Sequence, residues 1–250
     1  MKEQIDTIPV NDAFSAEDEC PFCYLERQSE QRAMRYALGP GASYMEPDVR
    51  AETDSMGFCR HHLKKMFDYG NALGNALVMQ TYFVGMLKEL EIEIDSFCMP
   101  GKRSFFSGKS SEPELPILKW AKEKNNTCFL CDRLAYNMDR YYTTFFYMIK
   151  DEAFREKVEN SKGFCMHHFA ELLEQAPKKL PNAQREWFYE TVLELMQDNL
   201  ARVQGDLDWF IEKFDYRNAS ADWKNSKDAV SRSMQKLRGG YPADPTYKMD

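Results

Sequence analysis

The residues of this chain best suited to chemistry are cysteines and histidines, which are concentrated in four sequence motifs, or words, of four residues each. Six of the seven cysteines and all four histidines lie in them. One pair of words is C-P-F-C at 20–23 with C-R-H-H at 59–62, and the other is C-F-L-C at 128–131 with C-M-H-H at 165–168. Thiolate and imidazole are the ligands that zinc prefers in proteins. The words therefore predict metal sites.

The words form an internal repeat. Cys59 follows Cys20 by 39 positions, and Cys165 follows Cys128 by 37 positions. Gly-Phe precedes the cysteine in both later words, at 57–58 and at 163–164. A repeat of this clarity must be recognised before a fold is assigned.

Helix geometry selects one histidine in each copy. A cysteine and a histidine three positions apart lie about 60° apart around a helix, whereas two positions correspond to about 200°. His62 and His168 are thus predicted to share a metal with Cys59 and Cys165, and His61 and His167 to point away. The predicted ligands for two zinc ions per chain, one site in each copy, are Cys20, Cys23, Cys59 and His62, and Cys128, Cys131, Cys165 and His168.

The residue types leave several alternatives open. Three thiolates and one imidazole also suit an iron–sulfur cluster. Four protein ligands fill a tetrahedral shell, which is typical of a structural site, whereas a catalytic zinc keeps one position free. His61 and His167 are then supporting or surface residues, with acid–base catalysis as the competing interpretation. Cys98, outside the repeat, is interpreted as an ordinary free thiol, with a redox role as its alternative.

The elements that must position these words are predicted to be helices. Apolar residues recur at spacings of three and four over 24–38, 72–97, 132–149 and a long stretch ending near 214. No segment sustains the strict alternation of a half-buried strand. The predicted fold class is all-α: two tandem zinc-stapled helical repeat units packed into a helical bundle, with a long C-terminal helix in each unit.

The same patterns predict domain boundaries. Residues 39–57, which contain Pro47, are expected to be less regular than the flanking helices. The predicted segments are a flexible lead-in at 1–19, a first helical unit at 20–97, a linker at 98–116, a second helical unit at 117–215 and a polar C-terminal tail at 216–250.

Composition limits the function classes. The chain has 250 residues, 43% of them hydrophobic, and a formal net charge of −7. The acidic balance argues against duplex nucleic acid as a partner, and a protein or a small-molecule ligand is expected instead. The N-terminus lacks the apolar region of a secretory signal, which predicts a cytoplasmic protein. The uncharged run 69–87 contains Asn71, Asn75 and Gln80, so no membrane span is predicted. The sequence does not determine the oligomeric state.

The tandem C-P-F-C … G-F-C-R-H-H and C-F-L-C … G-F-C-M-H-H arrangement resembles an uncharacterised bacterial family, a domain of unknown function with this two-copy pattern. The resemblance covers roughly residues 18–214 and implies no activity. Phe129 stands in the second copy where Pro21 stands in the first, and the ligand set is unaffected.

These observations lead to two functional hypotheses. The first is a zinc-binding helical scaffold or interaction protein whose metals are mainly structural. The alternative is a metal-thiolate enzyme, or a redox or metal sensor, that uses the Cys3His sites. Two near-equivalent closed sites favour the first hypothesis over an enzyme, because an active site is seldom needed twice.

Overall fold

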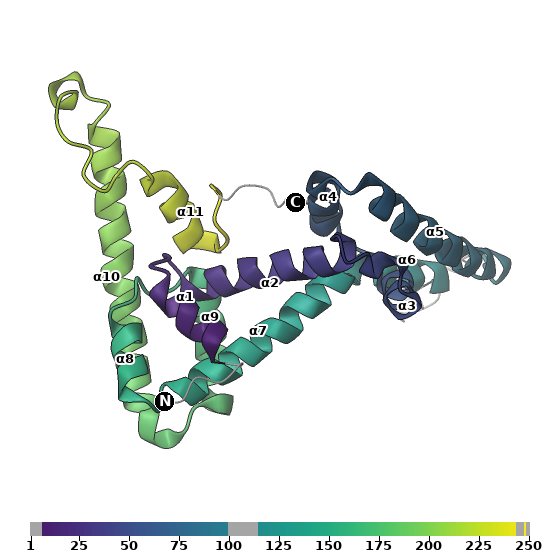
Figure 1. The fold of residues 1–250 in the computed structure, drawn as a ribbon, viewed down its shortest axis with the longest axis horizontal. Helices are drawn as coiled ribbons and strands as arrows, with labels where there is room; N and C mark the ends of the chain where they lie inside the picture. The colour runs from purple at the N-terminus through teal and green to yellow at the C-terminus, as the bar shows by residue number, and fades with distance from the viewer. Residues whose placement is uncertain (1–6, 100–114, 244–247, 249–250) are drawn as a thin grey trace, which may run out of the picture. The chain divides into compact units, whose positions relative to one another are not determined.

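The structure, a computed structural model, describes residues 7–99, 115–243 and 248, and over these residues it consists of helices and connecting segments without a strand (Figure 1). The all-α prediction is therefore confirmed for the described residues. The α-helices are α1 (Ile8–Ser15), α2 (Pro21–Leu38), α3 (Pro47–Met56), α4 (Arg60–Tyr69), α5 (Ala72–Asp95), α6 (Pro116–Asn126), α7 (Phe129–Met148), α8 (Glu152–Glu159), α9 (Met166–Lys179), α10 (Arg185–Glu212) and α11 (Ala229–Arg238). Three short 3-10 helices, Ser43–Met45, Asn182–Gln184 and Tyr216–Asn218, complete the list.

The chain divides into two compact units whose boundaries differ from the predicted 20–97 and 117–215. Unit 1 comprises residues 1–30 and 134–245, and unit 2 comprises residues 31–133 and 246–250. Helix α2 begins in unit 1 and ends in unit 2, and α7 begins in unit 2 and ends in unit 1. The boundaries differ because each long helix after a C-x-x-C word belongs to both units. Most of the predicted 98–116 linker lies outside the described residues.

Two segments predicted to be irregular are ordered helices in the structure. In the lead-in, α1 buries Val10 and Phe14 in the core of unit 1, because apolar residues three and four apart form one helical face. Between 39 and 57, α3 begins at Pro47, where proline is tolerated because a first-turn N–H has no partner within the helix.

The polar tail predicted at 216–250 also contains an ordered element. Helix α11 packs against α9 and α10. It buries Ala229, Gln235 and Lys236. The prediction underestimated this helix because its buried side chains are mostly polar ones whose hydrogen-bond partners are distant in sequence.

The core of unit 1 is aromatic. Phe22 stacks on Tyr142 with ring centroids 4.6 Å apart, and Phe14 stacks on Phe145 at 5.6 Å. Phe164, from the G-F-C word at 163–165, joins the same cluster. Phe22 and Phe164, next to Cys23 and Cys165 in the sequence, are therefore held in this aromatic core.

The core of unit 2 is smaller and has a lower share of aromatic residues. It includes Met34 and Leu38 of α2, Met66 of α4 and Leu130 of α7. Helix α5 packs against α3 and α6. Its length matches the predicted helix at 72–97, as α10 matches the long helix predicted to end near 214. Within the described residues, no helix combines the length and the apolar character needed to cross a membrane.

Candidate metal centres

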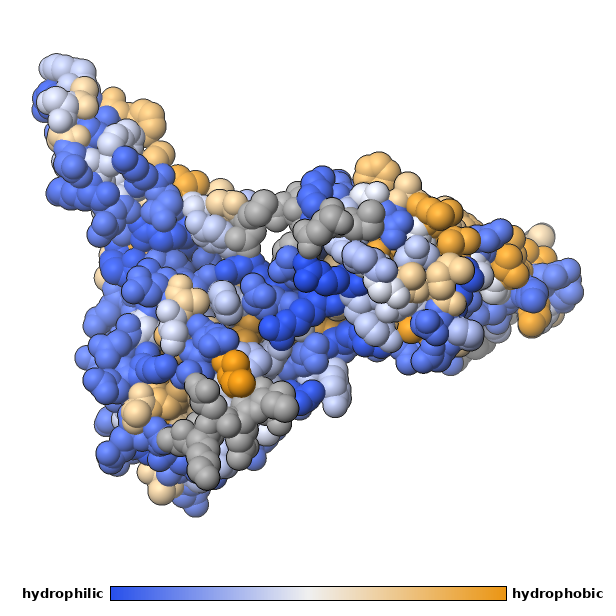
Figure 2. Space-filling model, in the orientation of Figure 1, coloured by the Kyte–Doolittle hydropathy of each residue, from blue (hydrophilic) through white to orange (hydrophobic). Residues whose placement is uncertain are grey.

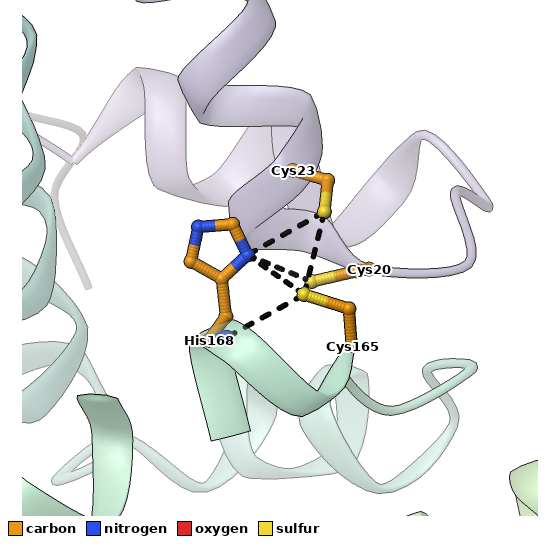
Figure 3. Close-up of side chains that lie close together, drawn as sticks. All are labelled: Cys20, Cys23, Cys165 and His168. Atoms are coloured by element: carbon orange, nitrogen blue, oxygen red, sulfur yellow. Dashed lines mark hydrogen bonds between the residues drawn. The ribbon is translucent and has the colours of Figure 1, made fainter. Parts of the chain in front are cut away.

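The eight predicted ligands come together in two groups of three cysteines and one histidine. Within each group the candidate ligand atoms all lie within 4.8 Å of one another. The unit 1 cluster consists of Cys20, Cys23, Cys165 and His168 (Figure 3). The unit 2 cluster consists of Cys59, His62, Cys128 and Cys131. Either group could hold a metal ion.

In the unit 1 cluster the histidine points its Nδ1 atom at all three sulfurs (Figure 3). The distances from His168 Nδ1 to the Sγ atoms of Cys20, Cys23 and Cys165 are 3.5, 3.4 and 3.1 Å. The Sγ atoms of Cys23 and Cys165 are 3.6 Å apart.

The unit 2 cluster repeats this arrangement. The distances from His62 Nδ1 to the Sγ atoms of Cys59, Cys128 and Cys131 are 3.3, 3.2 and 3.3 Å. The Sγ atoms of Cys59 and Cys131 are 3.8 Å apart.

These separations match one tetrahedral zinc ion. Zn–S bonds of about 2.3 Å and Zn–N bonds of about 2.0 Å place sulfurs about 3.8 Å apart, and a sulfur and a nitrogen about 3.5 Å apart. The separations in both clusters lie within about 0.4 Å of these values. A disulfide would require about 2.05 Å between two sulfurs, and none of the seven cysteines forms one.

The local geometry of each G-F-C-x-H-H word explains the choice of histidine. Cys59 is the N-cap of α4 and Cys165 is the N-cap of α9, so the third residue after each cysteine returns to its face of the helix. His62 and His168 are buried, whereas His61 and His167 are exposed. The structure thus places the four histidines as predicted.

The glycine of each word has a structural role of its own. Gly57 has φ 62° and Gly163 has φ 72°, backbone values that residues with a side chain rarely adopt. A Cβ at Gly57 would lie 2.6 Å from the ring of Tyr82, and one at Gly163 would lie 3.1 Å from the Leu195 carbonyl oxygen. The repeated glycine lets the chain turn into the cysteine while packing against a neighbouring helix.

The predicted grouping of ligands within each repeat copy is wrong. The structure pairs the C-x-x-C word of one copy with the C-x-H-H word of the other. The reason is the helix that follows each C-x-x-C word. Helix α2 has 18 residues, a length of about 27 Å. It carries the chain away from Cys20 and Cys23 before Cys59 is reached, and α7 does the same after Cys128 and Cys131.

Proton binding in the clusters is uneven without a metal. Hydrogen bonds from Cys20 and then Cys23 lower the pKa of the Cys165 thiol to about 4, against the effect of burial. Burial raises the pKa of Cys128, but hydrogen bonds from His62 and from backbone N–H groups bring it to about 6. The pKa of Cys23 is raised, mainly by its hydrogen bond with Cys165. The thiolate form is therefore stabilised at Cys165 and Cys128 and disfavoured at Cys23.

A carboxylate lies behind the unit 1 histidine. Glu26 Oε2 is 3.8 Å from His168 Nε2, the ring nitrogen that faces away from the sulfurs. Burial raises the pKa of Glu26, although His168 opposes this shift. At this distance the contact is electrostatic, because a carboxylate fixes the tautomer of a ligating histidine only when it accepts a hydrogen bond from the ring. Glu26 is thus placed to support His168.

The clusters differ in their exposure to solvent. All four residues of the unit 1 cluster are buried. In the unit 2 cluster Cys131 is exposed and Cys59 is partly exposed. Sequence spacing alone predicts equivalent sites, because it carries no information on what covers them.

The cover of the unit 1 cluster comes from the C-terminal segment. A Cβ at Gly239, the residue after α11, would lie 3.4 Å from Cys165 Sγ and 3.7 Å from Cys23 Sγ. The helix is held by Lys236, which donates to the Glu19 carbonyl oxygen at 2.6 Å, and by Gln235, which donates to Asp18 at 2.6 Å. The sequence-based prediction did not include a C-terminal segment that covers the unit 1 cluster. The Gly239-Gly240 pair is the sequence feature that could have indicated it.

The chain belongs to DUF6062, a family of unknown function, whose family model matches residues 1–244. The predicted resemblance to a family of unknown function is in agreement with this match. No curated protein and no solved structure matches the chain.

Proposed function

We propose that this member of DUF6062 binds two zinc ions, one in each cluster, and serves as a zinc-stapled helical scaffold that binds another protein. The observation that carries the proposal is the pair of Cys3His groups whose ligand atoms have the separations of a tetrahedral ion. Two independent groups with the same composition and the same histidine atom are difficult to explain as packing alone.

Four protein ligands complete the coordination of a tetrahedral zinc, so the proposed role of the metal is structural. In unit 1 an ion would connect Cys20 and Cys23, at the start of α2, with Cys165 and His168, at the start of α9. Cys23 and Cys165 are 142 positions apart. Because the unfolded chain lacks such a site, the metal-binding free energy of about 10–16 kcal/mol contributes to folding.

The ligand set and its dimensions favour zinc over the iron–sulfur alternative. Thiolate and imidazole ligands in a tetrahedron are typical of zinc. An iron–sulfur cluster would hold its protein ligands farther apart, because several irons and sulfides lie between them. The distance of 3.8 Å between the sulfurs of Cys59 and Cys131 leaves room for a single ion.

Each cluster combines ligands from both repeat copies, and this pairing allows the proposal to be tested. Metal content per chain is measured by inductively coupled plasma mass spectrometry on purified protein. Wild type is expected to hold two zinc ions, and Cys59→Ser one. Cys59→Ser combined with Cys128→Ser removes two ligands of one cluster, and one ion is expected to stay bound. Cys59→Ser combined with Cys20→Ser damages both clusters, and no ion is expected to stay bound.

The matched control is Cys98→Ser, which changes an exposed cysteine outside both clusters and is expected to leave two ions. If ligands were grouped within each copy, the two double variants would give the opposite result. Wild type without bound metal after expression in zinc-containing medium would overturn the proposal.

One observation favours a second candidate function for unit 2 alone. Cys131 is an exposed member of its cluster, and zinc-bound thiolates retain nucleophilic character. The candidate function is a reactive metal-thiolate sensor in which this sulfur meets electrophiles or oxidants first. With iodoacetamide as a probe, the Cys131 sulfur would displace iodide and form a thioether.

Peptide mass mapping of zinc-loaded protein after brief iodoacetamide treatment tests this candidate. Cys131 is expected to be alkylated well before Cys20, Cys23 or Cys165, with loss of the unit 2 zinc. Equal slow alkylation of all six cluster cysteines would exclude a sensor role for unit 2.

A further inference from the structure

Helix α5 has two opposite faces, and among the described residues the buried positions of the helix lie on one of them. The buried residues of this 24-residue helix are Gly74 and Val78. This inner face packs against α3 and α6. Glu89, farther along the same face, accepts hydrogen bonds from Trp120 and Lys124 of α6. One side of α5 is therefore fixed within unit 2.

The outward face carries a heptad pattern. Its positions alternate spacings of three and four through three consecutive heptads, as in the contact seam of a coiled coil. The residues of this α5 seam are Leu73, Ala76, Gln80, Phe83, Leu87, Leu90 and Ile94. At about 100° per residue, the seam lies about 180° from the face that contains Gly74 and Val78.

The seam is exposed although it is mostly apolar. All its members except Leu90 are exposed, Leu73 to 67% and Leu87 to 60%. Hydrophobic side chains are visible along α5 in the space-filling view (Figure 2). An exposed apolar stripe of this length is unusual on a monomer and marks an interaction surface.

We propose that the α5 seam pairs with the α5 seam of a second copy of this chain, so that two antiparallel α5 helices form a homodimer interface. A strict spacing of three and four serves helix pairing, because it keeps one narrow seam against a partner helix that supercoils with it. A self-complementary surface of this kind is what a two-fold dimer requires.

The available area is sufficient for such a dimer. The large exposed apolar residues on and beside the seam are Leu73, Phe83, Val84, Leu87, Ile94 and Phe97. If each loses about 100 Å² of accessible apolar surface, the pairing buries about 600 Å² per copy. Stable protein interfaces bury about 800 Å² per partner, and polar side chains along the rim would supply the remainder.

Charge determines the orientation. Glu91, Glu93 and Asp95 lie together at the C-terminal end of α5. A parallel pair would place these carboxylates beside their copies, and like charges at adjoining positions repel. The antiparallel pair separates them and places the small Ala76 opposite the larger Ile94.

Sedimentation velocity of the zinc-loaded full chain tests the proposal. Wild type is expected to be a dimer at micromolar concentration. Leu87→Glu places a charge in the centre of the seam and is expected to shift the protein to monomer, with at least a hundredfold rise in the dissociation constant. The matched control is Leu193→Glu, the same change at an exposed leucine of α10, which is expected to leave the dimer intact. Circular dichroism and zinc content are compared for each variant, so loss of folding is distinguished from loss of pairing.

Substitutions at Ala76 test the antiparallel orientation of the two α5 helices. In the antiparallel pair, residue 76 lies near the acidic end of the second α5, so Ala76→Lys is expected to weaken the dimer less than Ala76→Glu. Equal weakening by the two changes would overturn the antiparallel arrangement. A wild-type monomer, a dimer insensitive to Leu87→Glu, or a monomer that binds phosphatidylcholine vesicles through the seam would overturn the homodimer. None of these results depends on whether the metals are structural.

Discussion

Gly239 offers a direct test of how the protein protects one of its two clusters. Its backbone has φ 83° and ψ −175°, a region that is almost restricted to glycine. A side chain there is expected to cost about 1–3 kcal/mol from backbone strain alone. The added Cβ of Gly239→Ala would also lie 3.4 Å from Cys165 Sγ, in close contact with a sulfur that a metal would hold in place.

The magnitude of the effect follows from this cost. If the C-terminal segment must move away before a chelator reaches the unit 1 cluster, then Gly239→Ala increases the open fraction by the same free energy. A cost of 1–3 kcal/mol corresponds to release about 5 to 150 times faster. The unit 2 cluster already has an exposed cysteine, so its release rate is not expected to change.

The assay is zinc release from the full chain to an excess of a coloured chelator, followed in a stopped-flow instrument. Two phases are expected for wild type, a fast one from the unit 2 cluster and a slow one from the unit 1 cluster. Gly239→Ala is expected to accelerate only the slow phase. Gly205→Ala, in α10 of the same unit with no atom near the added Cβ, is the control and is expected to change neither phase. A single phase in wild type, or an unchanged slow phase in Gly239→Ala, would refute the reasoning.

Three further predictions follow from the same contacts. His62→Ala and His168→Ala are each expected to remove one zinc per chain, while His61→Ala and His167→Ala retain both ions, as measured by mass spectrometry. Chelation is expected to lower the melting temperature and the helical circular dichroism signal, with zinc restoring both, because metal-binding energy contributes to folding; an unchanged melting temperature would contradict the structural role. Burial raises the pKa of Glu89, but hydrogen bonds from Lys124 and Trp120 outweigh it and lower the pKa. The stabilisation by the Glu89 carboxylate is therefore present above the unfolded pKa of about 4.3 and is lost as the pH falls through the lowered folded pKa. Glu89→Gln is expected to reduce the free energy of unfolding by about 0.5 kcal/mol at pH 7 and by little at pH 3. Urea unfolding at the two pH values measures the difference.

Local spacing was sufficient to predict several features of the protein. Helical periodicity predicted the all-α class and the long helices α5 and α10. The three-residue offset between Cys59 and His62 predicted which histidine faces the sulfurs, because a cysteine at a helix N-cap and a residue three positions later share a face. These predictions depend only on the geometry of a single helix, which is encoded within a few residues.

The tertiary structure alone decided how the ligands are grouped and which group is covered. Cys20 has equivalent-looking candidates in Cys59 and Cys165, and spacing cannot distinguish them. The choice depends on α2 and α7, which carry the chain away from each C-x-x-C word and leave the two ends of each helix in different units. The cover depends on α11, whose anchoring by Lys236 to the Glu19 carbonyl oxygen joins residues 217 positions apart. Contacts between residues so distant in sequence are set by packing, and no local pattern records them.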